Sequence, residues 1–188
     1  GGFGQKAHVH PEELVVCLVA RKLGRPVSWI EDRQENLLAG THAKHQVNET
    51  QLAVDEQGKF LALKNYVSTD SGAYNCLPWT ASVEGKVGVT TMTGVYKIPQ
   101  ANLESVELTT SKCPIGAYRG VGWTAGQIAR EALIDLAARK LQLSPFEIRR
   151  RNIIRADDFP YTTASGMVIR EGSFAQTLDR LESMVDFA

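Results

Sequence analysis

Cysteine is scarce in this sequence, and the chain has no net charge. The three cysteines, Cys17, Cys76 and Cys113, are far apart and match no zinc or redox spacing, which favours a reducing compartment over a disulfide framework. We therefore expect a cytoplasmic protein. Twenty-one basic residues balance twenty-one acidic ones, so the overall charge attracts neither nucleic acid nor an anionic membrane. Any anion site has to be local.

Long apolar runs and metal-binding patterns are lacking too. No segment approaches the about 20 apolar residues that a membrane-spanning helix needs. His8 and His10 are two residues apart, and His42 and His45 are three apart. No cysteine or carboxylate spacing completes a metal site around them. The sequence also contains no paired carboxylates, nucleophile elbow or assembled triad, so we assign no catalytic and no metal-binding residue within the chain.

Length and composition suit a globular fold. The 188 residues, 43% of them hydrophobic, are enough to bury a sizeable core in one domain or two small ones. A helix is predicted from Pro11 to Leu23, because Pro11 suits a first turn and Gly24 suits a stop. Its apolar residues recur on one face. They are Leu14, Val15, Leu18, Val19 and Leu23.

A long hairpin is the clearest β-structure signal. Residues 45–54 and 59–68 alternate in polarity and flank a turn-forming segment rich in polar residues. Alternation of this kind predicts two antiparallel strands with one buried face. We expect Leu61, Leu63 and Val67 to share that face.

Two further strands and several helices complete the predicted fold. Residues 27–30 predict a short strand, and residues 95–109 predict a longer one in which Pro99 indicates an edge position or a bend. Capping boxes, in which a hydroxyl binds the amide three residues on, predict helix starts at Thr124, Ser144 and Ser173. The prediction is therefore an α+β fold: a mixed sheet with a long hairpin and packed helices, the latter concentrated in the C-terminal third.

The chain begins with a glycine-rich loop, Gly1-Gly2-Phe3-Gly4-Gln5-Lys6. Because glycine has no β-carbon, backbone amides there can approach the oxygens of a ligand, and Lys6 can add a positive charge. The segment has neither the Walker nor the dinucleotide spacing, so on these residues alone a structural turn is an equal alternative. A glycine loop normally follows a strand, and we therefore expect a fragment of a larger subunit.

A second glycine-rich segment, Gly116–Trp123, precedes the helix predicted at Thr124. A helix N-terminus presents free amides and a partial positive charge, and Arg119 adds a planar set of donors. The alternative is that Arg119 pairs with a carboxylate while Gly120 and Gly122 only shape a loop. Two such segments, each before a helix, favour one shared anionic ligand.

Six segments resemble the molybdopterin-binding domain of the molybdenum hydroxylases, the family of xanthine dehydrogenases, aldehyde oxidases and carbon monoxide dehydrogenase large subunits. The segments occur in the family's order, which makes the resemblance specific, and the resemblance extends over nearly all of this chain but only part of the family's large subunit. The segments are Gly1-Gly2-Phe3-Gly4-Gln5-Lys6, Thr69–Tyr74, Tyr96–Pro99, Ala117-Tyr118-Arg119-Gly120, Ser144–Asn152 and Pro160–Thr163.

The resemblance implies a molybdenum–pterin cofactor, which bacteria often carry as molybdopterin cytosine dinucleotide. It implies that Gly2, Phe3 and Gly4 make backbone contacts to this cofactor and that Arg119 and Gly120 form a second contact loop. It further implies an oxidoreductase that hydroxylates a small molecule with water-derived oxygen. Electrons then pass to 2Fe-2S clusters and FAD on partner subunits or domains.

In this family the catalytic glutamate belongs to a part of the pattern beyond Ala188. The resemblance therefore implies that residues 1–188 are a partial molybdopterin-binding domain, inactive in isolation, whose partners are the remainder of the large subunit and the iron–sulfur and FAD-binding subunits. A second hypothesis is a cofactor-free assembly or interaction module related to this family, in which the glycine loops only shape a subunit interface.

Departures from the family pattern narrow the substrate. Carbon monoxide dehydrogenases have a cysteine where this chain has Gly120. Xanthine-using members have a glutamate at the position of Ala7 and a phenylalanine at that of Val121. The resemblance thus argues against carbon monoxide and purines and favours an aldehyde or an N-heteroaromatic substrate. We expect Ala7, Ala117 and Val121 to line its pocket, because small side chains leave room there.

Overall fold

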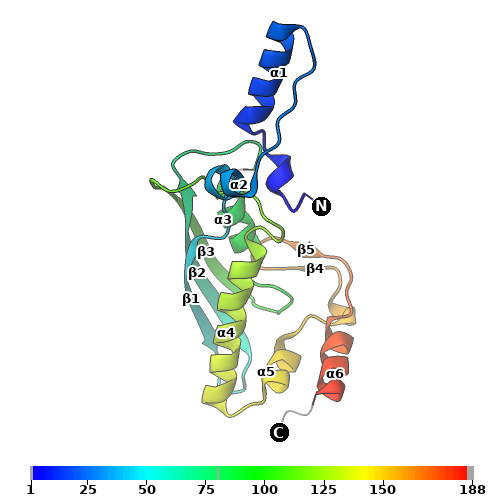
Figure 1. Cartoon of the computed structure of the whole chain (residues 1–188). Coiled ribbons are helices and arrows are strands. Elements are labelled where there is room, and N and C mark those ends of the chain that lie inside the picture. Colours follow the sequence, from blue (N-terminus) through cyan, green and yellow to red (C-terminus); the bar gives the residue numbers. More distant parts are fainter. Residues whose placement is uncertain (1, 80, 186–188) are drawn as a thin grey trace.

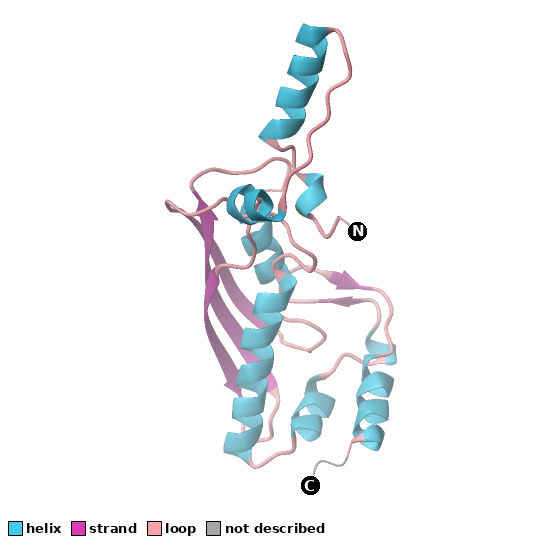
Figure 2. Cartoon of the chain, viewed as in Figure 1, coloured by secondary structure: helices cyan, strands magenta, loops and turns pink. Residues whose placement is uncertain are grey.

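A three-stranded mixed sheet with helices on one face dominates the computed structural model, which describes residues 2–79 and 81–185 (Figures 1 and 2). The predicted α+β class is confirmed. The helices are α1 (Pro11–Leu23), α2 (Arg33–Ala39), α3 (Ala81–Thr90), α4 (Trp123–Leu141), α5 (Pro145–Asn152) and α6 (Phe174–Met184), with 3-10 turns at Gln5–Ala7 and Ala156–Asp158. The strands are β1 (Gln46–Val54), β2 (Phe60–Gly72), β3 (Gln100–Thr109), β4 (Tyr161–Thr162) and β5 (Val168–Ile169).

The predicted hairpin is confirmed as β1 and β2, which pair antiparallel. Strand β3 pairs parallel to β2, so the order in the sheet is β1-β2-β3. A parallel partner needs a crossover connection, and the segment containing α3 provides it. Strand β3 begins at Gln100, directly after Pro99, so the bend predicted there is present and the predicted strand start at residue 95 is wrong.

A bulge near the hairpin turn changes which side chains face the core. Ala53 pairs with Ala62 but Val54 pairs with Phe60, so Leu61 is an extra residue that reverses the alternation. Leu63 and Val67 are buried as predicted, whereas Leu61 is 44% exposed and Phe60 is fully buried. The prediction that Leu61 shares the buried face is therefore wrong.

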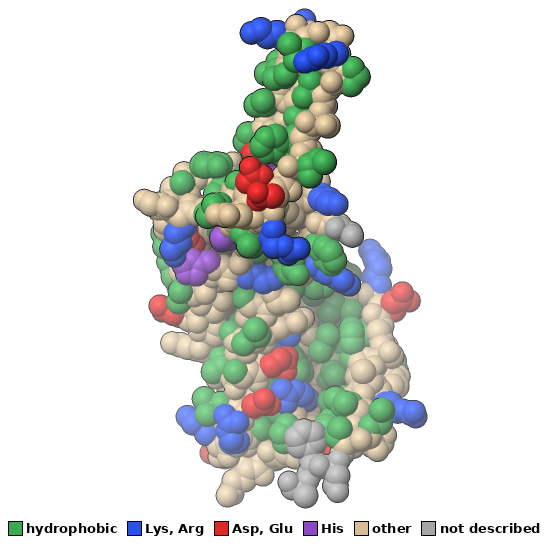
Figure 3. Space-filling view, viewed as in Figure 1, with side chains coloured by type: hydrophobic (Ala, Val, Ile, Leu, Met, Phe, Trp, Pro, Cys, Tyr) green, Lys and Arg blue, Asp and Glu red, His purple; other side chains and the backbone are tan. Residues whose placement is uncertain are grey.

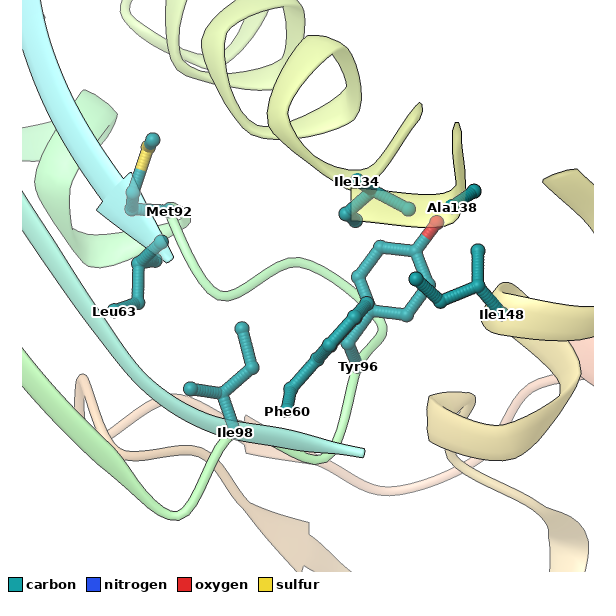
Figure 4. Close-up of a cluster of buried hydrophobic side chains, with 8 residues drawn as sticks. All are labelled: Phe60, Leu63, Met92, Tyr96, Ile98, Ile134, Ala138 and Ile148. Carbon is teal, nitrogen blue, oxygen red and sulfur yellow. The ribbon is translucent and has the colours of Figure 1, made fainter. Parts of the chain in front are cut away.

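The main hydrophobic core lies between the sheet and the helices (Figure 4). Helix α4 packs on β1, while α3 packs on β2 and β3. Burial of these large apolar side chains supplies the main driving force for folding. The core consists of Phe60, Leu63, Met92, Tyr96, Ile98, Ile134, Ala138 and Ile148.

Helix starts match the capping predictions only in part. Ser144 caps α5, because its Oγ accepts a bond of 3.0 Å from the amide of Glu147. Ser173 occupies the N-cap of α6 without a side-chain bond. Helix α4 begins at Trp123 with Gly122 as its N-cap, so the predicted cap at Thr124 is wrong. A glycine is needed at 122 because α3 passes directly against it.

Helix α1 is confirmed at its predicted bounds, and Gly24 ends it with a left-handed φ of 64°. The helix projects away from the rest of the chain (Figures 1 and 3). Its apolar stripe is 37–65% exposed at Leu14, Val15, Leu18, Val19 and Leu23. Residues 27–30, which follow it, form no regular secondary structure and pair with no described strand. The strand predicted there is wrong, since no neighbouring strand lies beside it.

Candidate functional site

The two glycine loops, far apart in sequence, lie against each other in the structure. Gly1 lies outside the described residues. The first loop contacts the second through Phe3 and Gly4. The ring of Phe3 stacks on that of Tyr118, with centroids 6.4 Å apart and an angle of 21° between the planes. Gly4 packs against the backbone of Ala117. The first and second loops therefore form one continuous surface.

Gly4 allows this contact because it has no side chain. A β-carbon at this position would lie 2.3 Å from the carbonyl oxygen of Ala117, well inside van der Waals contact. The φ of Gly4 is also 104°, a value that residues with side chains rarely adopt. The resemblance implies that Gly4 contacts a cofactor, and the structure shows that its close approach to Ala117 requires a glycine there.

A buried histidine links the same two loops. The amide of Ala117 donates to Nε2 of His8 over 3.1 Å, and His8 is 3% exposed. Nε2 must be unprotonated to accept this bond, so the imidazole is neutral. Burial lowers the pKa of His8, and the nearby His10 lowers it further. Sequence reasoning treated His8 only as a rejected metal ligand and missed this structural role.

Asp70 anchors the segment that leads into the second loop. Its carboxylate accepts hydrogen bonds from Thr110 Oγ1 at 2.7 Å and from the amide of Gly72 at 2.8 Å, and it pairs with Lys112 at 3.0 Å. The Thr110 hydroxyl and the other donors lower the pKa of Asp70. A β-carbon on Gly72 would lie 2.2 Å from the carbonyl of Cys113. The Asp-Ser-Gly stretch thus holds the chain that carries Ala117.

The second loop has a strained backbone at Val121. The φ of this β-branched residue is 32°, in the left-handed region, which such residues occupy only where the surroundings enforce it. Nζ of Lys44 donates to the Val121 carbonyl over 2.9 Å and lies 5.8 Å from the ring centroid of Tyr118. Strained residues of this kind cluster at functional sites.

Helix α3 supports the second loop from behind. A β-carbon on Gly122 would lie 1.9 Å from the carbonyl oxygen of Glu84. Glu84 is only 1% exposed, so its carboxyl group is buried behind the loop. Burial raises the pKa of Glu84, while the positive charge of Lys44 lowers it. No sequence pattern pointed to α3 or to this carboxyl group.

Unpaired donors on both loops suit an anionic ligand. The amides of Phe3 and Gly4, and those of Tyr118, Arg119 and Gly120, donate to no described residue. The exposed Arg119 side chain forms no ion pair with any described carboxylate, so the alternative in which it pairs internally has no support there. Phosphate and pterin oxygens are acceptors of the kind these groups bind.

An apolar pocket of about 530 Å³ opens beside the joined loops. Two of the three predicted pocket residues, Ala117 and Val121, line it, whereas Ala7 is exposed and is not part of its lining. Sequence reasoning missed the side chains that make up the rest of the wall. The complete lining is Gly4, Trp79, Val83, Val87, Ala117, Gly120, Val121 and Trp123.

Comparison with known proteins identifies the fold. A family model of the molybdopterin cofactor-binding domain matches residues 1–153. The chain belongs to this family. The chain is 50% identical, over all 188 residues, to the nicotine 6-hydroxylase large subunit of Paenarthrobacter nicotinovorans. It is 34% identical to the carbon monoxide dehydrogenase large chain of Hydrogenophaga pseudoflava, and in each case it spans 23% of the relative.

A solved structure shows the same arrangement of this domain. Quinoline 2-oxidoreductase from Pseudomonas putida 86 superposes with a TM-score of 0.95 at 64% identity, covering 98% of this chain and 23% of that one. Within residues 2–79 and 81–185, no three His, Cys, Asp or Glu side chains are grouped so that they could hold a metal ion. No helix in those ranges has the length and apolar character needed to cross a bilayer.

Proposed function

We propose that this chain is part of the large subunit of a molybdenum hydroxylase, where it holds the molybdenum–pterin cofactor beside an N-heteroaromatic substrate. The observation that carries the proposal is the contact between the two glycine loops, which brings unpaired amides of both into one surface. When bound, the cofactor supplies the redox chemistry that adds a water-derived oxygen to the substrate.

The chain's own residues have distinct roles in this proposal. Backbone amides at Gly2, Phe3 and Gly4 in the first loop, and at Arg119 and Gly120 in the second, would hold the cofactor by donating to its oxygens. The Arg119 guanidinium would neutralise a phosphate of the cofactor. The cofactor carries such a phosphate in both its mononucleotide form and its cytosine dinucleotide form. Such fixed dipoles bind an anion without reorganisation. None of these residues donates or accepts a proton in the reaction. In this proposal the base is a glutamate in another part of the subunit.

The substrate class follows from two lines of support. Two relatives are named for action on ring nitrogen compounds, nicotine and quinoline. In the second loop, Gly120 stands where carbon monoxide dehydrogenases have a cysteine. Ala7 stands where xanthine-using members have a glutamate, and Val121 stands where they have a phenylalanine. We therefore favour an N-heteroaromatic compound over an aldehyde, a purine or carbon monoxide.

Larger partners complete the enzyme in this proposal. Residues 1–188 span 23% of the nicotine 6-hydroxylase large subunit, and another relative is named as a subunit of a dehydrogenase complex. We propose that the rest of the large subunit covers the apolar stripe of α1. Separate subunits or domains with 2Fe-2S clusters and FAD accept the electrons, and the complex is cytoplasmic.

The test is the molybdenum content of the purified full-length complex and its hydroxylation of nicotine or quinoline in ¹⁸O-labelled water. We expect one molybdenum per large subunit and label in the product. Arg119→Ala should lower molybdenum content without changing complex assembly, while Arg170→Ala, an exposed arginine outside the loops, should change neither. A complex without molybdenum, in which Arg119→Ala disrupts assembly, would instead establish the cofactor-free assembly module.

A further inference from the structure

Two tryptophans border the apolar pocket beside the loops. Trp79 lies in the segment before α3, and Trp123 is the first residue of α4. Their side chains are 47% and 52% exposed. Tryptophan is highly buried on average, so two exposed indoles at one pocket leave a large apolar surface open to a ligand. Because the two indoles come from different elements and meet at one pocket, they point to a ligand rather than to a local packing need.

The chemistry of the pocket wall restricts what can bind. None of the eight lining residues carries a charge, and apart from the glycines the lining is aliphatic or aromatic. Lys44 donates to the Val121 carbonyl and Glu84 is 1% exposed outside the lining, while the exposed Arg119 belongs to the joined loops and is not part of the wall. A charged ligand would lose its hydration here without compensation. The wall therefore suits a flat, uncharged ring.

The pocket also adjoins the candidate cofactor surface. Gly4, Ala117 and Gly120 belong both to the pocket wall and to the joined loops. The strained backbone of Val121, fixed by Lys44, sets the side of the pocket next to them. A ring held in the pocket is thus next to the place where the cofactor binds, which is where the substrate of a hydroxylase has to lie.

We propose that Trp79 and Trp123 are specificity-determining residues that bind the uncharged aromatic ring of the substrate through stacking and apolar contact. The proposal rests on the proposed function for the position of the cofactor, but binding of the ring is a property of the pocket itself. Aromatic contact favours two-ring or substituted one-ring compounds over short aliphatic aldehydes.

The experiment uses the full-length complex and two probes. Equilibrium dialysis measures the dissociation constant of 2-naphthol, a flat two-ring compound without a ring nitrogen, and steady-state kinetics measure KM and kcat for quinoline. Trp123→Ala and Trp79→Ala should each raise both the dissociation constant and KM about tenfold. We expect kcat and molybdenum content to stay within about twofold, because neither indole acts in the reaction.

Matched variants separate this role from a structural one. Trp123→Phe retains a ring and should recover most of the affinity. Trp29→Ala removes an indole of similar exposure, 53%, that lies outside the pocket, and should leave both constants unchanged. Equal 2-naphthol binding in wild type, Trp79→Ala and Trp123→Ala would overturn the proposal, even if the complex hydroxylates quinoline. A molybdenum-free wild type would overturn the proposed function, while the 2-naphthol result would still decide the role of the tryptophans.

Discussion

Replacing Gly4 by alanine should disconnect the two loops. The new methyl group would lie 2.3 Å from the Ala117 carbonyl oxygen, where ordinary contact begins at 3.4 Å, so the loops have to separate by about 1 Å. The φ of 104° adds a backbone cost of about 1–3 kcal/mol for a residue with a side chain. We expect Gly4→Ala to lose both stability and the alignment of donors that the cofactor needs.

The size of the effect differs between the two properties. Stability should fall by about 3 kcal/mol, because the clash is with backbone and cannot be relieved by a rotamer change. A displacement of about 1 Å in a catalytic site can cost about 100-fold in rate. The assay is thermal unfolding of the full-length complex, combined with its molybdenum content and kcat for quinoline.

Gly166→Ala is the matched control. Gly166 also has a left-handed φ, 84°, but nothing lies within 4 Å of its missing β-carbon. The substitution should therefore cost about 1 kcal/mol from backbone strain alone and leave molybdenum content unchanged. If Gly4→Ala and Gly166→Ala behave alike in all three measurements, the contact between the loops does not exist as described.

Three further predictions concern the supports of the site. Because the pKa of His8 is lowered, its neutral form stabilises the fold fully above pH 6.5, and this contribution is lost as the pH falls below that value. The melting temperature of His8→Gln should lack this part of the pH dependence. Identical plots of melting temperature against pH for His8→Gln and the wild type would refute the bond to Ala117. Asp70→Asn should destabilise the chain by about 3 kcal/mol in chemical denaturation, because the Thr110 hydroxyl and the buried Gly72 amide lose their charged acceptor, and a change below about 0.5 kcal/mol would contradict this role. Lys44→Met should lower the free energy of unfolding by about 1.5 kcal/mol, because the Val121 carbonyl loses its hydrogen bond. Amide hydrogen exchange in the second loop should then become faster. Unchanged exchange would show that Lys44 does not hold this loop.

Local patterns predicted much of the fold. Polarity alternation located the β1–β2 hairpin, and the apolar stripe from Leu14 to Leu23 located α1. Short-range rules failed where a distant neighbour decided the conformation. The bulge at Leu61 depends on pairing with β1, and α3 contains Gly85 and Gly88, which disfavour a helix on their own. Gly85 is needed because a β-carbon there would lie 2.2 Å from the Ser105 hydroxyl.

The candidate site shows the same division. Its glycine loops and Arg119 were identifiable from residue types and from ordered motifs, because a loop that approaches an anion needs those residues locally. The bond from Ala117 to His8 spans 109 positions and that from Lys44 to Val121 spans 77, and no local pattern encodes such contacts. Ala7 was expected in the pocket because it stands where xanthine-using members of the family have a glutamate, but it is exposed and does not line the pocket beside the loops.

The sequence by itself determined which segments could bind an anionic cofactor, since the absence of side chains at Gly2, Gly4 and Gly120 and the donors of Arg119 are properties of single residues. It also determined that α1 has one apolar face. Only the tertiary structure decided that the two loops meet, that the α1 face is exposed in this chain, and that Trp79 and Trp123 border one pocket. These features depend on which distant segments pack together, and packing is set by the whole core rather than by any local pattern.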